Sequence, residues 1–156
     1  MNHLTFKQFE LTRSWFIESA ESVPRGIASV QPEGFSNTIH WHIGHVLTAS
    51  EQLMFGFHHK KFHLPAVYTK LFERGTSPAD WGGDVPPVDE LITQLKDQWD
   101  RIQQIPAKQL NENLEEPFIG LETFGELAGF AIVHEAIHMG KIEEMKRVIE
   151  LGGARN

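Results

Sequence analysis

Cysteine is absent from this chain of 156 residues. Its absence excludes thiolate metal ligands, cysteine nucleophiles and disulfides, and it is compatible with a reducing cytosol. Long apolar runs are missing as well: no stretch approaches the roughly 18 residues that span a bilayer, and the N-terminus has no basic segment followed by an apolar one. We therefore expect a cytoplasmic protein with no membrane partner.

Basic side chains are few and scattered, with 14 Lys and Arg against 21 Asp and Glu and a formal net charge of −7. Nucleic-acid binding needs clustered Lys and Arg to neutralise phosphates, so nucleic acid is not an expected partner. The remaining composition is that of a globular protein, and a chain of this length is about one domain. We predict a single domain over residues 1–156. The unusual component is histidine, with 9 residues.

Apolar residues spaced by three and four positions predict four helices, over about 5–23, 36–57, 88–105 and 123–151. Pro87 begins the third helix, and Thr123 with Glu126 forms a capping box at the start of the fourth. No stretch alternates apolar and polar residues over the length of a strand. The sequence therefore predicts an all-α four-helix bundle with long crossover connections. On the first helix, the polar side that includes Arg13 is expected to face solvent.

The connection between the second and third predicted helices, residues 62–87, is rich in proline and glycine. Connections longer than about 12 to 15 residues are usually functional lids or packed irregular segments. Tyr68, Phe72 and Trp81 offer apolar anchors within it. We expect this segment to pack across the bundle.

Two histidines, His134 and His138, interrupt the apolar stripe of the fourth predicted helix. Their spacing places both imidazoles on one face, one turn apart, where they can bind a single cation. A lone histidine on such a stripe is more often a satisfied core residue, but this buried pair would need two separate hydrogen-bond partners, and the flanking stripe offers none. The pair therefore predicts a divalent metal site. Imidazole ligands suit zinc, nickel, iron and copper without selecting among them.

The second predicted helix supplies three candidates for a third ligand. Measured at 100° per residue from the centre of the apolar stripe, His42 lies about 60° to one side, His45 about 120° to the same side and His40 about 100° to the other. Spacing alone thus favours His42, followed by His45. Either residue would complete a three-histidine site with open positions for water or substrate, which is typical of a catalytic centre.

The segment from His134 to His138 also matches the zincin pattern, in which two histidines bind zinc and the intervening glutamate is the general base. A zincin needs a third ligand beyond this helix, and Met139-Gly140-Lys141 departs from the metzincin continuation. A metallopeptidase is therefore the least favoured interpretation. On a helix Glu135 points about 100° away from His134, which favours a position on the surface or behind a metal ligand. The catalytic acid or base stays unassigned.

Two segments, taken together, resemble the DinB superfamily: Trp41-His42-Ile43-Gly44-His45-Val46-Leu47 and His134-Glu135-Ala136-Ile137-His138-Met139-Gly140-Lys141-Ile142. The resemblance implies a four-helix bundle in which the second helix gives one histidine to a divalent metal and the fourth gives two. Carried over residue by residue, the resemblance selects His45, His134 and His138 as ligands. This choice differs from the helical spacing, which favours His42 over His45. His42 then becomes a core residue or the neighbour of a ligand, and His40 faces solvent.

Proteins similar to this family include a related isomerase and thiol-dependent transferases, in which a low-molecular-weight thiol such as bacillithiol or mycothiol is activated at the metal. The resemblance implies a metal-dependent transferase or hydrolase that activates a thiol or water. It also implies one divalent ion, with zinc or nickel favoured over iron or manganese, and a homodimer. We expect a small-molecule substrate to enter beside residues 62–87. The alternative is a dimeric metal-binding bundle or ligand sensor without catalysis.

Overall fold

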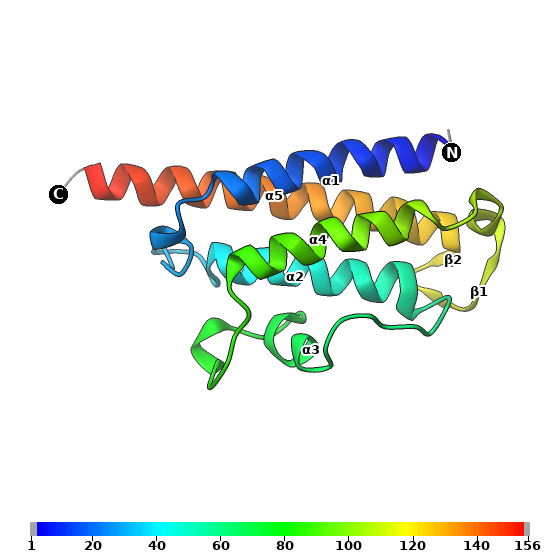
Figure 1. The fold of residues 1–156 in the computed structure, drawn as a ribbon, viewed down its shortest axis with the longest axis horizontal. Helices are drawn as coiled ribbons and strands as arrows, with labels where there is room; N and C mark the ends of the chain where they lie inside the picture. The colour runs from blue at the N-terminus through cyan, green and yellow to red at the C-terminus, as the bar shows by residue number, and fades with distance from the viewer. Residues whose placement is uncertain (1–2, 155–156) are drawn as a thin grey trace.

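Four long helices form a bundle in the computed structural model, which describes residues 3–154 (Figure 1). They are α1 (Leu4–Ser22), α2 (Ile39–Glu51), α4 (Val88–Gln103) and α5 (Phe124–Ala154). Both α1 and α2 pack against α4 and α5, which closes the bundle. This architecture confirms the predicted fold class. Within the described residues, no helix is long and apolar enough to cross a membrane.

The segment between α2 and α4 packs along the outside of α2, as its aromatic anchors predict. After Glu51 the helix continues as a π-helical turn, Gln52–Gly56, and the chain then returns along α2 through the short helix α3 (Val67–Phe72) and the 3₁₀ turn Pro78–Asp80 (Figure 1). Tyr68 and Phe72 of α3 are buried. With α3, α4 and α5 around it, α2 is enclosed, and every residue in the range 41–48 is buried.

A two-stranded antiparallel hairpin, β1 (Asn113–Phe118) and β2 (Leu121–Thr123), precedes α5. The sequence predicts no strand here, and the burial along β1 indeed lacks the alternation that would reveal one. The two residues of the turn, Ile119 and Gly120, have φ values of +46° and +86°. A positive φ is unusual for isoleucine, so the turn carries no sequence signal of the Asn-Gly kind. The capping box appears as predicted: the Glu126 amide donates to Thr123 Oγ1, and the Thr123 amide donates to the Glu126 carboxylate.

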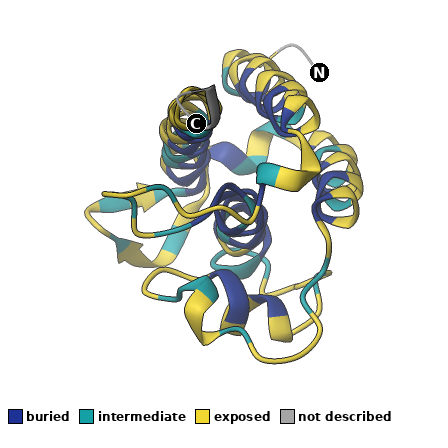
Figure 2. Ribbon diagram, turned by 90° about the vertical axis from the view of Figure 1, so that its left-hand side faces the viewer, coloured by how far each residue is buried: buried dark blue, intermediate teal, exposed yellow. Residues whose placement is uncertain are grey.

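The apolar core is divided along the bundle axis into two clusters, and in Figure 2 the buried side of each long helix faces the common interior. The cluster at the α3 end contains Phe16, Ile43, Leu91 and Met145, among others. The cluster at the hairpin end contains Phe9, Leu53, Ile102 and Phe124, among others. Between these two sets each long helix carries a buried polar side chain, and these four form a layer that we call the polar layer: Arg13, Glu51, Gln98 and Glu135.

The polar layer is hydrogen-bonded across all four long helices. Arg13 donates from Nε and Nη2 to the two carboxylate oxygens of Glu135 at 2.6 and 3.0 Å. Gln98 accepts from Arg13 and donates to Glu51, whose carboxylate also accepts two hydrogen bonds from Arg101. The expectation that Arg13 faces solvent is therefore wrong, since this side chain is 1% exposed. Its partner on α5 is distant in sequence, so the pattern of α1 alone could not reveal the pairing.

Candidate metal centre

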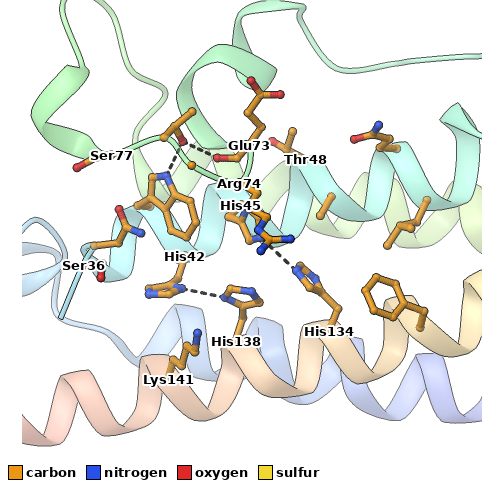
Figure 3. A pocket seen from close by; sticks show the side chains of 18 of the residues that line it. Ser36, His42, His45, Thr48, Glu73, Arg74, Ser77, His134, His138 and Lys141 are labelled. Carbon is orange, nitrogen blue, oxygen red and sulfur yellow. Dashed lines mark hydrogen bonds between the residues drawn. The ribbon is translucent and has the colours of Figure 1, made fainter. Parts of the chain in front are cut away.

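One ring nitrogen from each of His45, His134 and His138 lies within 4.8 Å of the other two (Figure 3). The enclosed helix α2 contributes His45, and α5 contributes the other two from successive turns. The Nε2 atoms of His45 and His134 approach to 3.1 Å. Such a group could hold a metal ion, because the three imidazole nitrogens are close enough to bind one ion together.

A backbone carbonyl fixes the orientation of His45. Its Nδ1–H donates to the carbonyl oxygen of Phe72 at 2.7 Å, so the neutral ring presents the lone pair of Nε2 toward His134. The indole of Trp41 stacks on the ring of His45, with centroids 4.5 Å apart and planes 10° apart. Metal-binding histidines commonly donate their second ring N–H to a carbonyl or carboxylate in this way.

Gly44 permits this contact. A Cβ atom at Gly44 would lie 2.3 Å from the ring of Phe72, so only glycine allows α3 to approach α2 so closely. Neither Gly44 nor the Phe72 carbonyl was identified from the sequence as a contributor to the site. A glycine inside an otherwise buried helix was the available signal, since it often marks a close approach.

His42 lies beside the three-histidine group and contacts one of its members. Its Nδ1 is 2.9 Å from Nδ1 of His138, so one of these rings donates to the other and the Nε2 of His138 is left free. The stripe geometry favoured His42 over His45 because it assumed one apolar side on α2, whereas this helix is buried on all sides at this level. His40 is also misplaced by the sequence analysis: it does not face solvent but is half-buried, and its Nε2–H donates to the Pro86 carbonyl.

The rings are held neutral at pH 7. Burial, together with the nearby Lys141 and His45, lowers the pKa of His42 and of His134 to about 4. The pKa of His138 falls to about 2 through burial and the neighbouring rings, and burial also lowers the pKa of His45. Neutral imidazoles offer lone pairs to a cation. Protonation of these rings is disfavoured by burial and by the positive charge of Lys141. The residues therefore fit a divalent metal.

The group opens into a cavity of about 1000 Å³. Its walls come from α2, from α5, from residues 73–77 after α3 and from the turn of the hairpin. The segment 62–87 thus contributes one wall of the cavity, through its residues 73–77. The cavity is wide enough for a small molecule to reach the three ring nitrogens.

Glu135 is turned away from the histidines. Its side chain is 0% exposed, and both carboxylate oxygens accept hydrogen bonds from Arg13 in the polar layer. A zincin needs this carboxylate beside the metal-bound water. The geometry therefore excludes the metallopeptidase interpretation, and it also corrects the suggestion of a surface position for Glu135.

Comparison with known proteins supports the same fold. A family model described as the DinB superfamily matches residues 8–142. Among solved structures, the crystal structure of the conserved protein of locus from Enterococcus faecalis is similar, with a TM-score of 0.66 over 93% of this chain and 94% of that one. The sequence identity is 16%, so this likeness shows the fold alone. No curated protein matches the chain.

Proposed function

The chain belongs to the DinB superfamily, and from this premise we propose that it is a metal-dependent enzyme in which His45, His134 and His138 hold one divalent ion. The proposed reaction is transfer to a low-molecular-weight thiol, or hydrolysis by water. Zinc and nickel are the favoured ions, with iron and manganese next. The observation that carries the proposal is the convergence of three neutral imidazoles at the wall of an open cavity.

A divalent ion held by three neutral ligands keeps its full charge and lowers the pKa of a bound thiol or water toward 7. Neighbouring residues of the chain orient the histidines that would hold the ion. The Phe72 carbonyl orients His45, and the ring of His42 orients His138 through their Nδ1 atoms. Lys141 is among the residues that line the cavity and opposes protonation of the ligands. An electrophilic substrate would then approach from the side of residues 73–77.

Metal content is the first test. Protein made without a polyhistidine tag, and kept away from nickel resin, is analysed for metals beside His45→Ala, His42→Ala and His63→Ala variants. We expect about one ion per chain in the wild type, its loss in His45→Ala, and retention in the exposed-residue control His63→Ala. His42→Ala should keep the ion with reduced affinity, by about 10- to 100-fold for a residue that orients a ligand.

Activity is the second test. An electrophile such as a haloaromatic or an epoxide is supplied with and without a low-molecular-weight thiol, and with and without the identified metal. Product that forms only when the metal and the nucleophile are both present supports catalysis. A protein that binds the metal but converts none of these substrates would instead support the non-catalytic metal-binding bundle or ligand sensor.

A further inference from the structure

Two cationic side chains line the cavity around the three histidines, Lys141 beside His138 and Arg74 beside His45. Lys141 on α5 and Arg74 on the segment after α3 both line it, and both side chains are exposed at its rim. Figure 3 shows Lys141 on the side of His138 and His42, and Arg74 approaching from the opposite wall. Among the residues that the structure describes, neither cation forms an ion pair with a carboxylate.

These two positive charges contrast with the charge of the rest of the molecule. The chain carries 21 acidic residues and a net charge of −7, yet Glu73 is the one carboxylate among the described residues that line the cavity. The charge of Lys141 reaches the four rings, since it lowers the pKa of His42, His45, His134 and His138. A positive cavity in a negative protein favours anions over cations as ligands.

The far side of the histidine group is apolar. The residues that line it come from the π-helical turn and the residue after it, from the hairpin and from the first turns of α5: Leu53, Phe57, Phe118, Ile119 and Phe130. Phe57 stacks against Phe118 at 4.7 Å, and Phe130 lies 6.0 Å from the ring of His134. Ile119 at the tip of the hairpin is 66% exposed, so apolar surface at this end is open to solvent.

An unpartnered polar atom lies on the same wall. Thr48 is 8% exposed, it lines the cavity one turn beyond His45, and its Oγ1 has no hydrogen-bond partner among the described residues. A buried hydroxyl without a partner is uncommon in folded proteins.

We propose that the cavity binds an amphipathic ligand, with an anionic head group held by Lys141 and Arg74 and an apolar arm lying between Phe57, Phe118 and Phe130. The proposal rests on the proposed function in that the histidine group lies between the two ends and would meet the middle of such a ligand. Phe130 and Lys141 are separated by about 16 Å along α5, from the rise of 1.5 Å per residue. An extended alkyl chain advances about 1.25 Å per bond, so a chain of about twelve carbons with a charged end spans this distance, whereas one of about six carbons spans half of it.

The test measures binding rather than turnover. Hexanoate, 1-hexanol and acetate are titrated calorimetrically into metal-loaded wild type and into Lys141→Met, Arg74→Met and Phe130→Ala, with metal content measured for each protein. Hexanoate should bind more tightly than either of the other two probes. Lys141→Met and Arg74→Met should each weaken hexanoate by about fivefold, the size expected for a partly exposed charge, and leave 1-hexanol unchanged. Dodecanoate is titrated into the same proteins, and Phe130→Ala should weaken its binding, because its chain is long enough to reach this residue, and leave acetate unchanged.

The matched control is Lys146→Met, which removes the same charge from the same helix outside the cavity lining. It should bind hexanoate as the wild type does. Equal binding of hexanoate and 1-hexanol, no binding of hexanoate, or an equal effect of Lys146→Met and Lys141→Met would each overturn the proposal. Failure of the proposed function has a different signature, because a protein without bound metal would still show the charge-dependent binding of hexanoate.

Discussion

Replacing Arg13 with methionine is expected to destabilise the protein strongly. The substitution keeps an unbranched, apolar side chain but removes the cation that contacts Glu135 in the polar layer. Both residues are almost completely buried, at 1% and 0% exposed. Removing one partner of such a pair leaves an uncompensated buried charge and costs about 3–5 kcal/mol. For a chain of this length each kcal/mol lowers Tm by about 2–4 °C, so we expect a decrease of about 10 °C.

A double-mutant cycle separates the effect of the lost charge on stability from the effect of altered packing. Glu135→Leu alone leaves Arg13 without its carboxylate, and the double variant Arg13→Met with Glu135→Leu removes both charges. A buried ion pair replaced by apolar residues of similar volume is often close to neutral in stability. The double variant should therefore recover most of the loss, with a coupling free energy of about 2 kcal/mol or more, in the upper range of those measured for residues in contact.

Urea unfolding followed by circular dichroism measures the four proteins in their metal-free form, and elemental analysis measures metal content in parallel. Because Glu135 faces away from the histidines, metal content per folded chain should be the same in all four. An Arg13→Met variant within about 1 kcal/mol of the wild type, or a double variant no more stable than the single ones, would refute the account of the polar layer. Loss of metal on Glu135→Leu would refute the placement of Glu135.

Three further outcomes follow from the site and its surroundings. Gly44→Ala should lower both thermal stability and metal affinity, because the added Cβ displaces Phe72 from His45. The control Gly140→Ala, on open helix surface, should lower neither. Differential scanning calorimetry with and without metal compares the two variants. The metal-free protein should lose stability as pH falls from about 6.5 toward 4, by up to about 1.4 kcal/mol per pH unit for each histidine of lowered pKa, and urea unfolding of His134→Asn should show a shallower loss. Burial alone would raise the pKa of Glu51, but hydrogen bonds from Arg101, Gln98 and the His63 amide lower it, so its ionised form stabilises the fold above pH 4.5. Glu51→Gln should therefore be less stable than the wild type at pH 7, and the difference should shrink below pH 4.5 as the wild-type carboxylate protonates; equal stability at pH 7 would contradict this.

The four long helices could be predicted from the sequence because each carries an apolar stripe with caps at its ends. The pair His134 and His138 was visible for the same reason, since two polar rings on a buried stripe require an explanation. The choice between His42 and His45 could not be made from periodicity, because α2 is enclosed by three neighbours and has no single buried side. Pairings between distant helices, such as that of Arg13 with Glu135, leave no local pattern either.

The polar layer lets the two walls of the cavity be altered separately. It separates the two apolar clusters, one of which includes residues of α3 while the other packs against the hairpin. Each cluster supports one end of the cavity. Substitutions in different clusters share few contacts, so their effects on stability should be nearly additive. Either wall of the cavity can then be redesigned without repacking the other. The hydrogen bonds between the clusters keep α2 and α5 in register while one wall is altered.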